Sequence, residues 1–157
     1  MQKIKSYVIF VLSALAVGGL SALLTSGNMD IYKVLKTPPL SPPSILFPIV
    51  WTLLYILMGV SAAMIYNTEA TSMQARKSAL YTYAISLFFN FFWSIIFFNM
   101  RSFLFAFIWL LALLFFIVRT ITKYKEINPL AAYLQIPYLL WVIFAGYLNF
   151  GIWYLNG

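Results

Sequence analysis

The sequence predicts an all-α membrane protein, a single bundle of five transmembrane helices. Its 157 residues are 64% hydrophobic and only 8% charged, whereas a soluble globular domain is about 25% charged. A helix needs about 20 mostly apolar residues to cross a bilayer. Five runs of that length are expected to span it, at about 6–26, 45–66, 79–98, 103–122 and 130–154. These runs leave no room for a soluble domain, so the lipid bilayer is the predicted environment.

The first run begins like a signal peptide, with Lys3 and Lys5 ahead of small and apolar residues. The apolar part of a signal peptide is about 7–15 residues long, and this run is longer. We therefore expect a spanning helix here. The connection that follows, residues 27–44, holds four of the seven prolines, and a fifth, Pro48, comes shortly after it. Each proline fixes its own φ and disfavours helix in the residue before it, which predicts an extended lid.

The remaining links indicate an up-and-down bundle and its orientation. The link at 99–102 is too short for anything but an antiparallel connection. Lysine and arginine in loops accumulate on the cytoplasmic side of a membrane. Seven of them fall on the N-terminal side of the predicted bundle and three on the lid side; the seven are Lys3, Lys5, Arg76, Lys77, Arg119, Lys123 and Lys125. We expect Arg76 and Lys77 in the second loop, and Arg119, Lys123 and Lys125 in the fourth. This asymmetry predicts a cytoplasmic N-terminus.

Several classes of function are disfavoured by composition. The chain has no cysteine and no histidine, the usual ligands of zinc, copper and haem iron, so neither a metal nor a cofactor is expected. Its three carboxylates, Asp30, Glu69 and Glu126, all fall in or beside predicted loops. That placement argues against a buried acid relay or paired-carboxylate catalysis. The basic residues form no aromatic-interleaved patch, so nucleic acid is not an expected partner.

Trp51, Asn90 and Ala145 fall deep in the predicted spans and at one level. At about 1.5 Å per residue, Trp51 lies about 9 Å inside the second span and Asn90 about 12 Å before the outer end of the third. Trp141 shares a helical face with Ala145 and Leu148 in the fifth span. Such aromatic stripes are either bundle core or the wall of a ligand cavity, and the pattern alone leaves both open. In a cavity, the Trp51 indole and the Asn90 amide would be the donors that orient a flat aromatic ligand.

Three stretches carry a resemblance to a known family. They are "PPLSPPSILFPIVWTLLYILMG" at 38–59, "LFFNFFWSIIFF" at 87–98 and "PYLLWVIFAGYLN" at 137–149. Together they resemble the translocator protein family, which comprises the bacterial tryptophan-rich sensory proteins (TspO/MBR) and the mitochondrial peripheral benzodiazepine receptor. The resemblance covers the chain from about residue 30 onward. If the bacterial branch applies, the expected location is the bacterial cell membrane.

The resemblance implies a receptor or transporter-like protein with a pocket under the first loop. Members bind porphyrins such as protoporphyrin IX, and isoquinoline carboxamides and benzodiazepines occupy the same pocket. Carried over by position, the pocket would be lined by Trp51, Asn90, Trp141, Tyr32, Pro42, Phe47, Tyr55, Phe91, Ser94, Phe144, Ala145 and Leu148. Many relatives have tryptophan where this chain has Leu40, which would leave the lid one ring short.

Two alternatives to simple binding stay open. Trp51 and Trp141 could donate electrons to an excited porphyrin and promote its light-dependent breakdown. Alternatively, the chain could be a non-catalytic interaction protein that acts as a homodimer. Small residues at Ala14, Gly18 and Ala22 form a ladder that suits helix association, and relatives dimerise, so a homodimer is expected. A sterol is a doubtful partner, because the weak sterol pattern fails in the last span, where no basic residue follows Tyr154.

Overall fold

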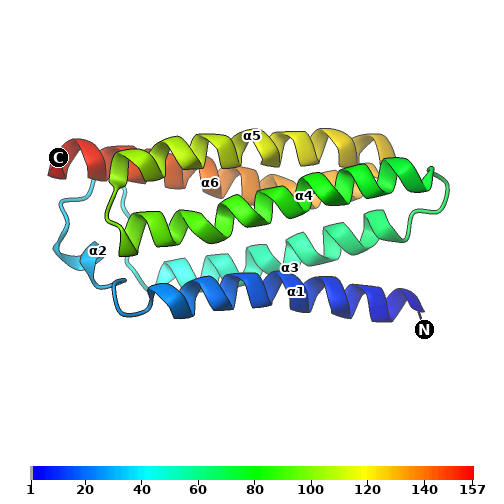
Figure 1. The fold of residues 1–157 in the computed structure, drawn as a ribbon, viewed down its shortest axis with the longest axis horizontal. Coiled ribbons are helices and arrows are strands. Elements are labelled where there is room, and N and C mark those ends of the chain that lie inside the picture. The colour runs from blue at the N-terminus through cyan, green and yellow to red at the C-terminus, as the bar shows by residue number, and fades with distance from the viewer. Residues whose placement is uncertain (1) are drawn as a thin grey trace.

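The computed structural model describes residues 2–157, and all the regular elements in this part of the chain are helices. Five of them are long and apolar enough to cross a membrane: α1 (Gln2–Thr25), α3 (Leu46–Tyr66), α4 (Met73–Ser94), α5 (Phe103–Ile127) and α6 (Pro129–Asn156). They run side by side along one axis, with the N- and C-termini at opposite ends (Figure 1). The predicted five-helix bundle is confirmed, and the chain is a multi-pass integral membrane protein.

The helices continue past the apolar runs that the sequence shows. Arg76 and Lys77 lie in the first turns of α4, and Lys123 lies near the end of α5. The expectation that these cations occupy loops is therefore wrong. A helix ends where its hydrogen bonding ends, and long basic side chains can reach the headgroup region from a helical backbone. The start of α4 is set instead by Ser72, whose side chain accepts a hydrogen bond from the Ala75 amide.

The helices form a ring in which α1 packs on α3, α3 on α6, α6 on α5, α5 on α4, and α4 again on α1. The α5–α6 connection is tight because Asn128 caps α6, accepting a hydrogen bond from the Leu130 amide, and Pro129 occupies the first helical position. Residues of α1, α3, α4 and α6 face a common space beneath the lid. The space between these four helices is where a site can form.

The small residues of α1 pack against α3 within one chain. A Cβ on Gly59 would lie 2.4 Å from Val11 Cα, and one on Gly18 would lie 2.2 Å from the Tyr55 ring. Ala14 is fully buried between them. The small-residue ladder is thus largely used to bring two helices of the same bundle close together, and it does not support a dimer. The homodimer stays a prediction.

The lid is only partly extended, because it contains one helical turn, α2 (Ile31–Val34). Beyond that turn it lies against the end of α6 (Figure 1). Pro38 is buried so closely on Gly151 that a Cβ there would come within 2.5 Å of the proline ring. The Tyr147 hydroxyl donates a 2.6 Å hydrogen bond to the Pro39 carbonyl oxygen. The lid is therefore held closed by contacts with α6.

Candidate functional site

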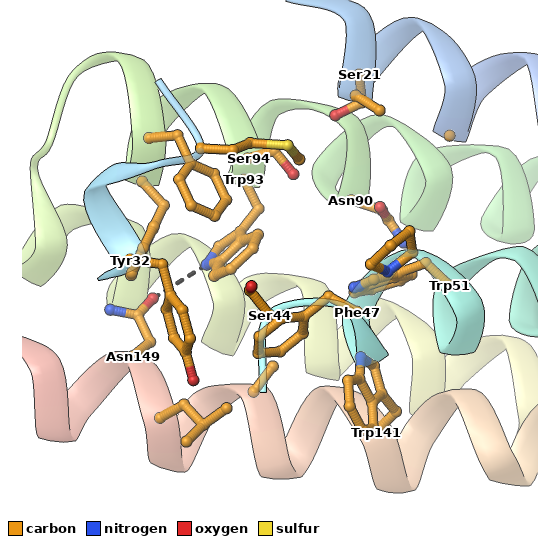
Figure 2. A pocket seen from close by; sticks show the side chains of 18 of the residues that line it. Ser21, Tyr32, Ser44, Phe47, Trp51, Asn90, Trp93, Ser94, Trp141 and Asn149 are labelled. Atoms are coloured by element: carbon orange, nitrogen blue, oxygen red, sulfur yellow. Dashed lines mark hydrogen bonds between the residues drawn. The ribbon is translucent and has the colours of Figure 1, made fainter. Parts of the chain in front are cut away.

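A cavity of about 250 Å³ lies beneath the lid. Its walls come from α1, α3, α4 and α6, and its cover from the lid, as Figure 2 shows for Ser21, Trp51, Asn90, Trp141 and Tyr32. Nine of the twelve residues expected to line a pocket line this one: Tyr32, Phe47, Trp51, Tyr55, Asn90, Ser94, Trp141, Ala145 and Leu148. Residues far apart in sequence thus share one apolar chamber.

The other three expected residues do not line the cavity, and each supports its wall from behind. The Pro42 carbonyl oxygen accepts a 3.0 Å hydrogen bond from the Tyr32 hydroxyl. Successive helical residues point about 100° apart, so the Phe91 side chain points away from the face that carries Asn90. The backbone carbonyl oxygen of Phe91 accepts a hydrogen bond from the hydroxyl of Ser21 on α1. The Phe144 ring packs on Trp141 with centroids 5.5 Å apart.

Asn90 joins three helices beside the cavity. Its Oδ1 accepts a 2.8 Å hydrogen bond from the Tyr55 hydroxyl, and its Nδ2 donates one of 2.8 Å to the Tyr138 hydroxyl. The asparagine is only 4% exposed. Its amide, expected to be a donor for a ligand, is hydrogen-bonded on both polar atoms, although these bonds use only one of its two Nδ2–H groups. Asn90 instead fixes the positions of two tyrosines on α3 and α6.

A second polar link closes the lid end of the bundle. The Trp93 indole Nε1 donates a 3.0 Å hydrogen bond to Asn149 Oδ1, drawn as a dashed line in Figure 2. Asn149 Nδ2 in turn donates one of 2.9 Å to the Phe103 carbonyl oxygen at the start of α5. Trp93 is held in place in this way, with its ring stacked on Phe97 at 5.1 Å. Its indole N–H is already paired and is not free to orient a ligand.

Trp141 carries a buried donor at this site that is unpaired within the described chain, and Trp51, whose indole N–H is expected to orient a ligand, also lines the cavity. The Trp141 Nε1 is buried and has no hydrogen-bond partner within residues 2–157. The ring lies against Phe47, with centroids 5.9 Å apart at 65°, and Figure 2 shows the two side chains meeting at the same side of the cavity as Trp51. A buried indole N–H usually has a partner. A ligand acceptor placed beside Trp141 would supply one.

The π surface of the cavity is built from two groups of rings. Trp51 lies 5.6 Å from the Tyr55 ring and 6.3 Å from the Tyr138 ring, measured between centroids. Phe47 and Tyr32 meet edge to face at 5.2 Å beneath the lid. Such a wall suits a flat aromatic molecule, which gains from stacking and edge contacts on several sides.

The chain resembles known proteins over nearly its whole length. The model of the TspO/MBR family matches residues 10–155. This chain belongs to the TspO/MBR family.

Three relatives show how far the TspO/MBR likeness extends. The chain is 39% identical to the tryptophan-rich protein TspO of Chlorobaculum tepidum, over 80% of this chain and 78% of that one. It is 30% identical to protein CrtK of Rhodobacter capsulatus, over 96% and 92%. It is 33% identical to the translocator protein of Bos taurus, over 88% and 83%. The likeness thus reaches bacterial and mammalian members.

Nine of the 20 lining residues were expected in this TspO/MBR protein, and two groups among the other lining residues are informative. Gly18, Ser21 and Ala22 of α1 form one side of the cavity, although their small size had suggested a dimer surface. Phe98 lines it together with Phe97. The i, i+3, i+4 spacing of Gly18, Ser21 and Ala22 can be read from the sequence. Nothing in the local sequence indicates that Phe98 lines the cavity.

Phe98 reaches the cavity where α4 ends in a π-helical turn, η1 (Ile95–Asn99). An extra residue in the turn changes the direction of the side chains that follow, and such turns are frequent at functional sites. In an unbroken α-helix, Phe97 and Phe98 would point about 100° apart. The turn lets both rings contribute to the same TspO/MBR cavity.

Leu40 contributes nothing to the wall. It is 85% exposed, and its φ of 71° places it in the left-handed region that non-glycine residues rarely adopt. The expectation that leucine here leaves the site one ring short is not supported, because this position points away from the cavity. Burial of Tyr32, on the inner side of the lid, raises the pKa of its hydroxyl, which stays protonated and donates to Pro42.

Proposed function

We propose that this TspO/MBR protein binds a flat tetrapyrrole, protoporphyrin IX, in the cavity beneath the lid. The observation that carries the proposal is the combination of an aromatic wall with the buried indole N–H of Trp141, which has no partner within residues 2–157. Ring stacking supplies most of the attraction, and the indole N–H supplies direction. Isoquinoline carboxamides and benzodiazepines have the same flat aromatic character and a carbonyl acceptor, so they are proposed to compete for this cavity.

The closed cavity is smaller than such a ligand requires. Its volume of about 250 Å³ lies below the roughly 300–1,000 Å³ typical of drug-sized sites. Phe47 separates Trp141 from the lid, touching both that ring and Tyr32. A shift of Phe47 with the lid would enlarge the chamber and expose the Trp141 N–H in one movement. Binding is thus proposed to require lid opening.

Replacing Trp141 by phenylalanine is expected to weaken protoporphyrin IX binding by about tenfold. The change keeps an aromatic ring but removes the donor and part of the π surface, which together correspond to about 1.5 kcal/mol. The measurement is a titration of the purified protein with protoporphyrin IX, followed by quenching of tryptophan fluorescence. The same titration with a competing isoquinoline carboxamide tests whether both ligands use one cavity.

The matched control is Trp153→Phe, which removes an indole from α6 without touching the cavity. It should bind as tightly as the wild type, and equal affinities for all three proteins would contradict the proposal. A double variant, Trp51→Phe/Trp141→Phe, tests the photochemical alternative. Porphyrin absorbance that falls under illumination at the same rate in the wild type and in Trp51→Phe/Trp141→Phe would exclude electron donation by these rings.

Replacing Gly151 by alanine is expected to speed ligand release about threefold to tenfold. The new Cβ would collide with the Pro38 ring at 2.5 Å, so the lid would be pushed off α6 and lose packing of about 1 kcal/mol. Release is measured by stopped-flow dilution of the porphyrin complex. An unchanged dissociation rate would show that the lid contact does not control release.

Gly27→Ala provides the control for Gly151→Ala. Gly27 lies at the start of the same lid, but a Cβ there meets no atom within 4 Å. This substitution stiffens the connection without displacing it, so the dissociation rate should stay at the wild-type value. A similar acceleration in both variants would assign the effect to lid flexibility rather than to the Pro38 contact.

A further inference from the structure

A second hollow lies at the opposite end of the bundle from the lid. It is a groove of about 800 Å³ between the N-terminal part of α1, the C-terminal end of α3 and the start of α4. Figure 1 shows α1 and α4 diverging toward this end, where the N-terminus lies. The groove is separate from the lid cavity and shares no residue with it.

The charges lining this groove are predominantly positive. Lys5 comes from α1, and Arg76 and Lys77 come from α4, while Glu69 is the one acidic residue on its wall within the described chain. Glu69 is exposed to solvent, which weakens its effect on a buried anion. The first turn of α4 also lines the groove, and the free backbone amides at a helix N-terminus favour negative charge. A net positive groove of this kind attracts an anion.

Arg76 is oriented for such an anion. Its Nη1 donates a 2.8 Å hydrogen bond to the Tyr66 carbonyl oxygen at the end of α3. Its Nε is buried and has no partner in residues 2–157. Guanidinium groups bind phosphate through several parallel N–H donors. The arginine is thus anchored at one nitrogen while another donor remains unpaired, an arrangement that a phosphate oxygen would complete.

The groove becomes apolar toward the middle of the bilayer. Ile9 and Phe10 follow Lys5 by about one turn of α1, and Leu80 follows Arg76 by one turn of α4, which places them about 6 Å deeper. Ile9 is 55% exposed. The cations and the apolar side chains therefore match an amphiphile, with an anionic head above a hydrocarbon chain. A free nucleotide or acidic peptide would leave the apolar half uncovered.

We propose that this groove binds one anionic phospholipid. Its phosphodiester lies beside Arg76, Lys5 and Lys77, and one acyl chain lies along Ile9 and Leu80. The groove is at the end of the bundle that carries seven of the ten basic residues, and basic pockets between spanning helices on such a side are suited to anionic headgroups. The proposal does not depend on what the lid cavity binds.

The test is native mass spectrometry of the full chain released from detergent containing equal amounts of phosphatidylglycerol and phosphatidylcholine with identical acyl chains. The wild type should retain one phosphatidylglycerol in preference to phosphatidylcholine. Each of Lys5→Gln, Lys77→Gln and Arg76→Gln should lower that preference about fivefold, the change that corresponds to about 1 kcal/mol per cation near an anionic headgroup. Equal retention of the two lipids by the wild type would overturn the proposal.

Lys125→Gln is the matched control, because it removes a cation from the same end of the bundle outside the groove. Lys125→Gln should leave the preference for phosphatidylglycerol unchanged. If it lowered that preference as much as the groove variants do, the preference would come from general surface charge and not from the groove. Since Arg76→Gln also removes a bond to α3, the two exposed lysines test the proposal without that change. Displacement of the lipid by millimolar glycerol 3-phosphate would show that the groove recognises free phosphate, which would also overturn it.

Discussion

Gly59→Ala lowers the apparent melting temperature by about 6–12 °C, the largest effect expected of a single methyl group in this protein. The added Cβ would lie 2.4 Å from Val11 Cα and 2.9 Å from the Phe10 carbonyl oxygen. Both are backbone atoms, so no side-chain rotation relieves the collision and α1 must move away from α3. Overpacking of this kind costs about 3 kcal/mol, and about 2–4 °C accompanies each kcal/mol in a chain of this size.

The measurement is thermal unfolding of the detergent-solubilised protein, with Gly19→Ala as the control. Gly19 is also on α1, but a Cβ there meets no atom within 4 Å. This variant should melt at or slightly above the wild-type temperature, because alanine favours helix more than glycine does. If Gly59→Ala and Gly19→Ala have the same melting temperature, α1 and α3 are not packed as closely as the structure shows.

Asn90→Leu is expected to destabilise the bundle by about 1–3 kcal/mol and to weaken protoporphyrin IX binding as well. Leucine matches asparagine in size but pairs with neither the Tyr55 nor the Tyr138 hydroxyl, each of which bonds to Asn90 at 2.8 Å. Hydrogen bonds between membrane helices contribute about 0.6 kcal/mol on average and up to about 1.7. Two of them are lost here, and both tyrosines lie beside Trp51.

The triple variant Asn90→Leu/Tyr55→Phe/Tyr138→Phe separates lost hydrogen bonds from lost packing. Removing all polar partners together avoids unpaired buried hydroxyls, and such replacements can be nearly neutral. The triple variant should therefore be more stable than Asn90→Leu alone by thermal unfolding. Additive destabilisation by the three changes would show that the network contributes little and that asparagine acts through its shape.

The composition and spacing of the sequence were enough to predict the class of this protein and much of one site. Burying about 20 apolar residues per span is imposed by bilayer thickness, so the number and order of the helices follow from hydropathy. Depth along the spans then places Trp51, Asn90 and Ala145 in one layer, and helical periodicity places Trp141 on the same face as Ala145. Nine of the twelve residues that the family resemblance implied line one cavity.

The ends of the helices and the hydrogen-bond partners could not be predicted in the same way. Hydropathy reports where the chain is apolar, whereas a helix continues as long as its backbone bonds are made, so Arg76 and Lys77 were placed in a loop. Asn90 requires a partner in the membrane, but its own periodicity does not say whether a ligand or a tyrosine supplies it. That choice depends on the distance between α3, α4 and α6.

The sequence by itself therefore determined a five-helix membrane protein with an aromatic layer beneath a proline-rich lid. Only the tertiary structure decided that α1 completes the cavity, that Asn90 is bonded to two tyrosines, and that the Trp141 indole N–H is buried without a partner in residues 2–157. The π-helical turn that brings Phe98 to the wall was also decided there. The physical reason is that hydropathy and periodicity are properties of one helix, whereas packing distance, rotation and hydrogen-bond pairing are properties of several helices in contact.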